Sequence, residues 1–343
     1  MFSRRIIAWQ RRYGRHDLPW QGADAYRVWL SEVMLQQTQV STVVPYYLRF
    51  VERFPDIRAL AAADEDDVLA CWSGLGYYSR ARNLRRAAQK VVQQHGGEFP
   101  QDFDSIMALP GIGRSTAAAI GALAFHQRRA ILDGNVKRVL ARYCAIEGYP
   151  GRKEIDKQLW DCAEALLPQR DIAVYTQGLM DLGASVCTRA KPDCAACPVR
   201  QDCAAYATDR VTELPTPRPR KAVPEKSSTF LMLMDGADIL LEKRPGSGLW
   251  GGLWCFPLAE NGEADIAARC ERRFGVQVAQ IESLPSFTHV FTHFKLHISP
   301  LLLRVTRRHQ AREPGSAWMN VADALQSGLP APVRKLVAGL ALW

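Results

Sequence analysis

The sequence predicts a protein of two domains, an all-α region followed by a smaller α+β domain. Its 343 residues are enough for two hydrophobic cores at roughly 100 to 200 residues per domain. Apolar residues recur with a helical spacing through residues 1–206, whereas residues 229–343 carry alternating patterns typical of strands. Between them, residues 207–228 contain four prolines, which indicates an extended linker rather than a regular element.

Composition and charge narrow the class of protein. Hydrophobic residues make up 48% and charged residues 23% of the chain, as in an average globular domain, which excludes a fibrous or disordered protein. No apolar run approaches the ~20 residues that span a bilayer, so we expect a cytoplasmic protein. The net charge of +9 lies mainly in residues 1–226, where a polyanionic partner would bind. The arginine-rich N-terminus could be an organelle transit helix, but the apolar pattern from Leu18 onward favours a part of the fold.

Helices and strands are expected where the periodicity is strongest. In the second domain, residues 229–234 and 239–242 flank Asp235-Gly236, a hairpin signal, and residues 286–305 alternate apolar and polar side chains. That domain should also contain helices at residues 264–274 and 331–342. No strand is expected before residue 207, where the expected helices are residues 26–37, 43–54, 66–72, 80–94, 115–125, 136–143 and 154–167.

Four of the nine cysteines lie close together, in the pattern C-x6-C-x2-C-x5-C. They are Cys187, Cys194, Cys197 and Cys203. Four thiolates suit either a tetrahedral zinc ion or an iron–sulfur cluster. One C-x2-C pair between longer arms favours a [4Fe-4S] cluster over zinc, and a chain without a secretory signal disfavours disulfides. The other five are interpreted as buried small hydrophobic residues: Cys71, Cys144, Cys162, Cys255 and Cys270.

A glycine-bearing turn with the sequence LPGIGRST, residues 109–116, separates two helical stretches. Gly111 and Gly113 lack a Cβ, so their backbone N–H groups can approach a ligand closely. The helix that begins near Ser115 would add the positive end of its dipole. We therefore favour a helix-hairpin-helix that binds a DNA backbone over a purely structural turn, which would need one glycine rather than two.

Two carboxylates stand in positions that suit catalysis. Asp133 comes just before a helix, where capping N–H groups would hold its carboxylate ionised; capping alone is the simpler role. Glu32 has apolar helical neighbours such as Val28 and Trp29, so its pKa should be raised and it could donate a proton near neutral pH. An ordinary ion pair between Glu32 and Arg27 is the alternative.

Two further segments present polar or aromatic side chains on tight turns. One is Gln36-Gln37-Thr38 at the end of a helix, and the other is GLGYYSRAR at residues 74–82. Aromatic residues at helix junctions usually belong to a core, but Tyr77 and Tyr78 lie between glycines and arginines. Side chains from these segments could therefore insert into a base stack.

Together, these motifs closely resemble the MutY family of adenine DNA glycosylases over nearly the whole chain. The matching segments are SEVMLQQT at residues 31–38, GLGYY at 74–78, the LPGIGRSTA turn, LDGNVKRVLAR at 132–142 and the four-cysteine loop. The wider superfamily, which includes endonuclease III, shares the hairpin, the aspartate and the cluster loop. The string EVMLQQT is what distinguishes the adenine-specific branch.

The resemblance implies a two-lobed helix-hairpin-helix glycosylase domain with a [4Fe-4S] cluster in residues 1–206, the linker 207–228, and a Nudix-like domain at 229–343. A six-helix lobe would span about residues 24–128, and a cluster lobe would combine residues 1–23 with 129–206, including the cysteine loop at 187–203. The implied partner is duplex DNA that contains adenine opposite 8-oxoguanine or guanine. We expect a monomer, associated with the nucleoid and not with a membrane, and no protein partner is indicated.

The resemblance also implies roles for individual residues. Gln37, Leu75 and Tyr77 would help to flip adenine out of the duplex. Glu32 would protonate the five-membered ring of adenine, and Asp133 would stabilise the oxocarbenium-like sugar or trap it covalently before water attacks. The expected DNA contacts are Gln36, Gln37, Thr38, Leu75, Tyr77, Gly111, Gly113, Ser115 and Lys137.

One position in the hairpin separates two kinds of glycosylase. In superfamily members that also cut the strand, a lysine in this turn attacks the sugar as an amine nucleophile. That place holds Ser115 here, so we expect a monofunctional glycosylase that leaves an abasic site. Weak Schiff-base trapping at Lys137 is the most that we expect.

The C-terminal domain resembles the Nudix-like module with which the family recognises 8-oxoguanine. Arg269, Arg272 and Arg273 stand where a hydrolytic Nudix box would carry metal-binding glutamates, so we expect a binding module without pyrophosphatase activity. The segment FTHVFTH at residues 287–293 matches the family's lesion-sensing loop, with a threonine in place of the usual serine. The residues expected to recognise the lesion are Phe291, Thr292 and His293.

Two other functions stay open from the residues alone. A non-catalytic DNA-binding protein with a cluster would use Glu32 and Asp133 only structurally. A Nudix nucleotide hydrolase tethered to DNA would need the glutamates that the arginines replace.

Overall fold

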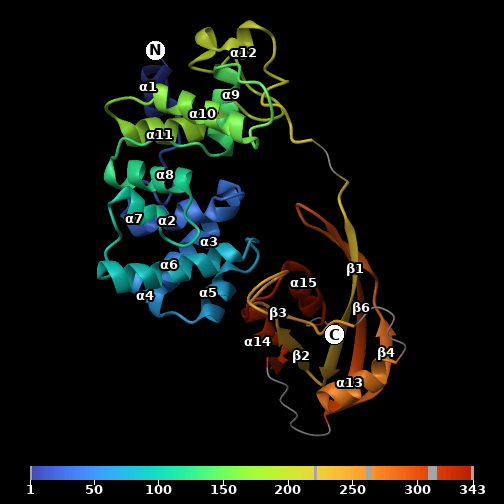
Figure 1. Cartoon of the computed structure of the whole chain (residues 1–343). Helices are drawn as coiled ribbons and strands as arrows, with labels where there is room; N and C mark the ends of the chain where they lie inside the picture. The colour runs from blue at the N-terminus through green and yellow to red at the C-terminus, as the bar shows by residue number, and fades with distance from the viewer. Residues whose placement is uncertain (1, 220–221, 260–264, 308–314, 341–343) are drawn as a thin grey trace. The chain divides into compact units, whose positions relative to one another are not determined.

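The structure, a computed structural model, describes residues 2–219, 222–259, 265–307 and 315–340 (Figure 1). The chain divides into two compact units. The first comprises Met1–Ala62 and Asn83–Arg220, and the second comprises Ala63–Arg82 and Lys221–Trp343. Among the residues that the structure describes, no helix is both long and apolar enough to cross a membrane.

The described part of the first unit is helical and contains no strand, as the sequence predicts. In α2 (Ala25–Met34), the apolar stripe buries Val28, Trp29 and Leu30, and Asp24 caps the helix by accepting a hydrogen bond from the Arg27 N–H. Its other helices are α1 (Phe2–Tyr13), α3 (Val40–Arg53), α4 (Ile57–Ala62), α7 (Phe103–Met107), α8 (Arg114–Phe125), α9 (Gly134–Tyr143), α10 (Lys153–Ala165), α11 (Ile172–Asp181) and α12 (Ala204–Ala207). Short π-helical and 3₁₀ turns lie at Leu182–Val186 and Arg200–Asp202, and α6 (Ser79–His95) runs into this unit from the second.

These helices form two groups, α2, α3, α4, α6, α7 and α8 in one and α1, α9, α10, α11 and α12 in the other (Figure 1). The second group surrounds a core that includes Ile6, Val139, Leu159 and Leu179. Because Phe2 and Ile6 are buried in that core, the arginine-rich N-terminus is part of the fold, as favoured above.

Helix α11 was not expected from the sequence. It buries polar as well as apolar side chains, including Thr176, Gln177 and Asp181. A helix buried on most of its surface shows no clear apolar stripe, so its periodicity gives little signal. The helices that were expected from the periodicity are all present.

A mixed sheet forms the centre of the second unit, in the order β3-β2-β1-β6-β4, with β5 paired to β6 and β7 to β2. The pairing of β1 with β6 is parallel and the others are antiparallel. Gly236 has a positive φ of 60° and turns the expected hairpin between β1 and β2. The strands are β1 (Glu225–Asp235), β2 (Asp238–Lys243), β3 (Trp254–Cys255), β4 (Val276–Ser283), β5 (Phe287–Val290), β6 (Lys295–Arg307) and β7 (Ser316–Asn320).

Both faces of this sheet are covered. Phe230 and Met232 of β1 point into a core shared with α14 (Val321–Gln326) and α15 (Ala331–Leu340), whereas Leu231 and Leu233 point into a core shared with α13 (Ile266–Phe274). A strand buried on both sides reads as a continuous apolar run, which explains the sequence FLMLM. The remaining helix of this unit is α5 (Glu65–Trp72).

The α+β class and both expected helices of the second domain are confirmed within the described residues. Residues 264, 341 and 342, at the ends of those two helices, lie outside the described residues. The prediction of an irregular linker is wrong for its last four residues, because β1 begins at Glu225. Residues 225–228 pair in parallel with residues 295–298 of β6, a long-range pairing that the local sequence does not reveal.

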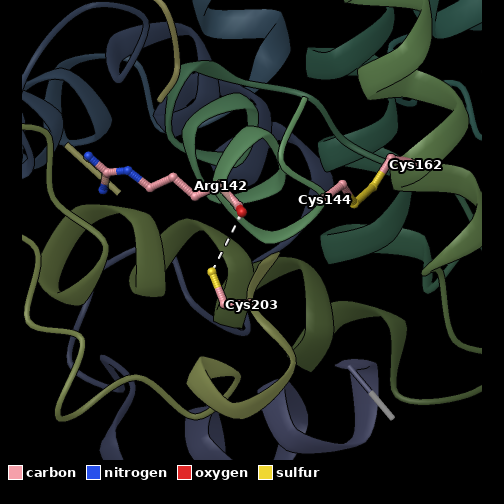
Figure 2. Close-up of a disulfide and its surroundings, with 4 residues drawn as sticks. All are labelled: Arg142, Cys144, Cys162 and Cys203. Carbon is pink, nitrogen blue, oxygen red and sulfur yellow. Dashed lines mark hydrogen bonds between the residues drawn. A yellow bond between two sulfur atoms is a disulfide. The ribbon is translucent and has the colours of Figure 1, made fainter. Parts of the chain in front are cut away.

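The cysteines outside the loop differ from expectation at three positions. Cys255 and Cys270 are buried free thiols as predicted, but Cys71 is partly exposed. Cys144 and Cys162 are joined by a disulfide that links the end of α9 to α10 (Figure 2). The interpretation of these two as separate buried thiols is therefore wrong, since helix packing rather than sequence spacing brings them together.

Candidate active site

Glu32 and Asp133 open into one cavity of about 1030 Å³ within the first unit. Glu32 lies near the end of α2, and Asp133 is the N-cap of α9. Helix α8, which packs against α2, contributes Ser115 and Thr116 to the same wall. The cavity is large enough to hold a flipped base and its sugar. The two carboxylates that the sequence singled out are thus brought together.

Asp133 is held by its own helix. Its Oδ1 accepts a hydrogen bond of 2.7 Å from the Val136 N–H, as expected for an N-cap. One residue earlier, the Leu132 N–H donates to the Ser115 Oγ over 2.9 Å. The hydroxyl of Ser115 therefore fixes the segment that leads into Asp133.

Glu32 has no ion-pair partner among the described residues. Arg27, the expected alternative partner, instead pairs with Asp24 at 2.5 Å. Burial, with a smaller contribution from the nearby Asp133 carboxylate, raises the pKa of Glu32 to about 8. At neutral pH the Glu32 carboxyl consequently holds a proton that it can donate, as the sequence predicted.

Burial also raises the pKa of Asp133, which corrects the expectation that capping alone keeps it ionised. Hydrogen bonds from the Val136 and Asn135 N–H groups and the charges of Arg138 and Lys137 oppose that rise. Glu32 has no such stabilising partners. Of the two coupled carboxyls, Glu32 therefore keeps the proton and Asp133 carries the negative charge.

The two glycines of the hairpin turn differ in what surrounds them. Gly111 has a positive φ of 80°, and a Cβ there would lie 2.9 Å from Asn83, so glycine is required by the protein itself. A Cβ on Gly113 would meet no protein atom within 4 Å. Gly113 caps α8, is exposed, and leaves the space outside its backbone open to a ligand.

Gln36, Gln37 and Thr38 line the cavity that holds Glu32 and Asp133. Gln37 is exposed and has a positive φ of 58°, which turns the chain sharply after α2. Gln36 Nε2 lies 3.4 Å from Thr116 Oγ1, and the Thr38 hydroxyl donates to the Gln36 carbonyl. This segment therefore contributes polar groups to the cavity wall.

Lys137 lies on α9 but outside the cavity, and its Nζ pairs with Asp156 of α10 at 2.5 Å. This ion pair links α9 to α10.

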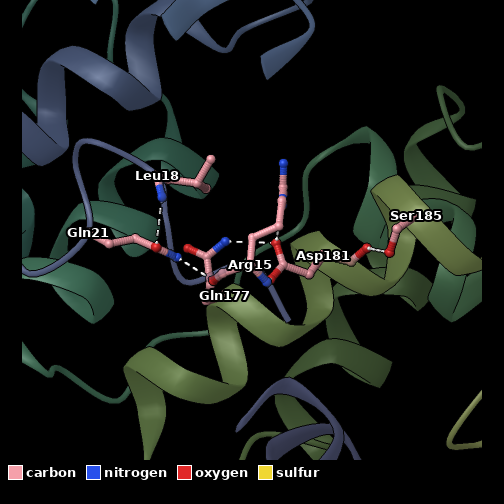
Figure 3. A network of polar contacts seen from close by, with 6 residues as sticks. All are labelled: Arg15, Leu18, Gln21, Gln177, Asp181 and Ser185. Atoms are coloured by element: carbon pink, nitrogen blue, oxygen red, sulfur yellow. Dashed lines mark hydrogen bonds and ion pairs between the residues drawn. The ribbon is translucent and has the colours of Figure 1, made fainter. Parts of the chain in front are cut away.

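Sequence reasoning missed a cation in the cavity wall. Arg15 lines the cavity, and its Nε and Nη2 contact Asp181 Oδ1 at 2.8 and 2.6 Å (Figure 3). Asp181 is only 1% exposed and also accepts a hydrogen bond from Gln177. The side-chain amide of Gln21 donates a hydrogen bond of 2.7 Å to the Arg15 carbonyl. The acid Asp181, which follows the apolar pair Leu179-Met180, was the available signal.

Arg138 is a second cavity-lining cation that was not expected. Its guanidinium donates to the carbonyls of Cys187 and Gly183 and to the side chain of Asn135, at 2.7 to 2.8 Å. Burial lowers its pKa, but an arginine stays protonated. Through Arg138, the helix that carries Asp133 is attached to the start of the cysteine loop.

All four loop cysteines line one cavity, together with apolar residues such as Val139 and Leu182. No group of three or more His, Cys, Asp or Glu that could hold a metal ion occurs in the described ranges. Four thiols around one apolar space nevertheless match the ligand set of an iron–sulfur cluster. The Arg142 Nη1 donates to Cys187 Sγ at 3.3 Å, and the Cys203 thiol donates to the Arg142 carbonyl (Figure 2).

The second unit holds the residues expected to sense the lesion. Tyr77 is 44% exposed, and its hydroxyl lies 2.7 Å from Thr292 Oγ1. Thr292 and His293 are exposed, whereas Phe291 stacks on Phe294 with ring centroids 4.3 Å apart. Leu75 is only 6% exposed, so it lies in the interior rather than on the surface where a wedge would insert.

On α13, Arg273 pairs with Glu242 and Arg269 donates to the Leu258 carbonyl, while Arg272 is exposed. All three arginines therefore lie on α13, within the helix that the sequence predicts at residues 264–274.

Comparisons with known proteins agree with this arrangement. A model described as "HhH-GPD superfamily base excision DNA repair protein" matches residues 30–165, and a NUDIX domain model matches residues 229–339. A solved thermostable thymine-DNA glycosylase is 30% identical with a TM-score of 0.55, covering 60% of this chain and 95% of that one. A solved endonuclease III–DNA complex, 19% identical with a TM-score of 0.51, shares the fold. The chain thus combines a helix-hairpin-helix base excision repair glycosylase with a Nudix domain.

Relatives that match almost the full length of this chain identify the kind of glycosylase. The adenine DNA glycosylase of Buchnera aphidicola subsp. Acyrthosiphon pisum is 39% identical and covers 98% of this chain and 97% of its own. The adenine DNA glycosylase of Rattus norvegicus is 34% identical and covers 98% of this chain and 77% of its own. The chain belongs to the adenine DNA glycosylase, or MutY, family, a family of enzymes rather than of non-catalytic DNA-binding proteins.

Proposed function

We propose that this enzyme hydrolyses the N-glycosidic bond of adenine mispaired with 8-oxoguanine or guanine in duplex DNA. The observation that carries the proposal is the shared cavity of Glu32 and Asp133, with the proton on Glu32. A protonated carboxyl facing an ionised one is the pairing that acid-assisted cleavage of a glycosidic bond needs.

Glu32 donates its proton to the five-membered ring of the flipped adenine, so that the base leaves without negative charge. As the bond breaks, positive charge develops on the sugar, and Asp133 stabilises it. Because Asp133 is fixed by the Val136 N–H and by the Ser115 contact one residue earlier, little reorganisation accompanies this step. Water then attacks the sugar carbon and leaves an abasic site.

DNA would reach the cavity past the polar side chains of Gln36, Gln37 and Thr38. The backbone N–H groups of Gly111 and Gly113 would donate hydrogen bonds to a phosphate. Tyr77, exposed in the second unit, is suited to insert beside the lesion, whereas Leu75 would have to leave the interior to do so. The exposed pair Thr292 and His293 would contact 8-oxoguanine.

We propose that the enzyme is monofunctional. Ser115 occupies the position of the nucleophilic lysine, and its hydroxyl is engaged by the Leu132 N–H. Lys137, the nearest alternative amine in sequence, is engaged by Asp156. A reaction that left the strand intact until alkali treatment would support this, whereas prompt strand cleavage with base release would contradict it.

The four loop cysteines would hold a [4Fe-4S] cluster that acts as a structural crosslink of the loop. Burial raises the pKa of Cys197 to about 11, so at neutral pH this thiol ionises only when a bound cation compensates. About four iron and four sulfide ions per chain are expected. One zinc ion per chain would contradict the proposal.

The decisive experiment is single-turnover release of adenine opposite 8-oxoguanine by the wild type and by Glu32→Gln. The wild type should release adenine and leave an abasic site, and the variant should bind the duplex without releasing the base. A duplex with thymine in place of adenine is the control, and a wild type that binds without release would contradict the proposal.

A further inference from the structure

A second pocket in the first unit is lined by three arginines. It has a volume of about 270 Å³ and lies between α7, α8, the end of α10 and the segment that follows α8. Arg114, Arg128 and Arg129 line it, and Glu164 is the one acid in its wall. It shares no lining residue with the catalytic cavity, so its chemistry is separate from base removal.

The three guanidinium groups are held in place by aromatic rings, backbone carbonyls and a single carboxylate. Arg114 stacks on the Trp160 ring at 3.8 Å and pairs with Glu164. Arg129 stacks on the Phe103 ring at 4.3 Å. Aromatic faces fix the direction of a guanidinium without removing its charge, so less side-chain entropy is left to lose when an anion binds.

Arg128 is fixed by backbone carbonyls. Its Nε donates to the Pro168 carbonyl at 3.0 Å, and its Nη2 donates to the Leu167 carbonyl at 3.2 Å. These bonds leave Nη1 of Arg128 available to a ligand. Within the described ranges, neither Arg128 nor Arg129 has a carboxylate at ion-pair distance.

The charge of the pocket is therefore unbalanced. Glu164 offsets Arg114, which leaves the positive charges of Arg128 and Arg129. Asp102 also interacts with Arg129, but its pKa is lowered mainly by the Ser105 N–H and hydroxyl, and Arg129 is the last of the causes. Asp102 caps α7 with its carboxylate, so it neutralises the pocket only in part.

We infer that this pocket binds a phosphate group. Planar guanidinium groups match phosphate oxygens in pairs, and the remaining charge fits one phosphate. The volume admits a phosphate but is at the lower limit for a drug-sized molecule, about 300 Å³. Arg114 directly follows Gly113, so a phosphate of the bound duplex is one source and a free phosphoanion is the other.

The test compares the full-length Arg128→Gln/Arg129→Gln variant with Arg4→Gln/Arg170→Gln. The control removes the same charge from exposed positions that line neither cavity. In the first arm, the dissociation constant for a duplex is measured against salt. Loss of one phosphate contact should lower the slope of log Kd against log salt by about 0.9 relative to the control.

In the second arm, pyrophosphate is added without DNA at constant ionic strength. A free-phosphoanion site predicts that pyrophosphate raises the melting temperature of the wild type and of the control but not of the pocket variant. Either response supports a phosphate pocket, and the responding arm identifies the source. Equal behaviour of pocket variant and control in both arms overturns the inference.

Two further measurements keep the outcomes separate. Arg128→Lys retains the charge and should retain the wild-type slope, and Arg129→Gln alone serves if loss of the Arg128 bonds prevents folding. The duplex arm rests on the proposed DNA binding, but base release does not depend on this pocket. A wild type that fails to release adenine contradicts the proposed function alone, whereas unchanged salt and pyrophosphate responses contradict the pocket alone.

Discussion

The pH dependence of base release tests whether Glu32 is the acid. At pH 7, a carboxyl with the ordinary pKa of 4.5 is protonated in about one molecule in 300, whereas a pKa of about 8 protonates about nine in ten. Burial of Glu32 thus supplies the acid form at neutral pH. The single-turnover rate should be nearly constant from pH 6.5 to 7.5 and fall about 15-fold between pH 8 and 9.5.

The acidic side of the profile reports on Asp133. Burial raises the pKa of this carboxyl above the ordinary value of 3.8. As the pH is lowered, the rate should therefore begin to fall before pH 3.8 is reached, because Asp133 takes up a proton and loses the charge that stabilises the sugar. Low-pH rates require a check that the protein remains folded, which circular dichroism provides.

Glu32→Gln should reduce the rate by about 10²- to 10⁴-fold, the usual contribution of a general acid, and remove the alkaline fall. The duplex dissociation constant should stay within about threefold of the wild type, because the amide keeps the shape of the acid. Glu52→Gln, at an exposed position on α3, is the matched control. A wild-type rate that is flat to pH 9.5, or a Glu32→Gln rate within tenfold of the wild type, would refute the reasoning.

Three further predictions concern stability and positioning. Since the folded pKa of Glu32 is raised, its contribution to stability is complete below pH 4.5 and is lost as pH rises through about 8. Between pH 5 and pH 8.5, the free energy of unfolding of the wild type should therefore fall relative to that of Glu32→Gln by a few kcal/mol, at about 1.4 kcal/mol per pH unit. An equal pH dependence of the two free energies would contradict this. Asp181→Asn leaves Arg15 without its buried partner and should cost about 2 to 4 kcal/mol in denaturant unfolding, whereas the exposed control Asp161→Asn should cost less than about 1 kcal/mol. Ser115→Ala removes the acceptor of the Leu132 N–H, so adenine release should slow about tenfold with the duplex dissociation constant unchanged; rescue by Ser115→Thr would support positioning, and a wild-type rate would oppose it.

Local sequence determined the features that depend on neighbours a few residues apart. The N-cap role of Asp133, the apolar surroundings of Glu32, the glycine turn and the spacing of four cysteines all follow from short-range geometry. The helices with a clear apolar periodicity were predictable for the same reason, because such a stripe repeats every turn.

Only the tertiary structure decided which distant groups meet and how deeply each is buried. It placed Glu32 and Asp133 in one cavity, joined Arg15 to Asp181 across 166 positions, and paired Cys144 with Cys162. It also raised the pKa of Asp133 against its own capping bonds. Desolvation and long-range pairing depend on what the rest of the chain packs around a residue, and no window of sequence contains that information.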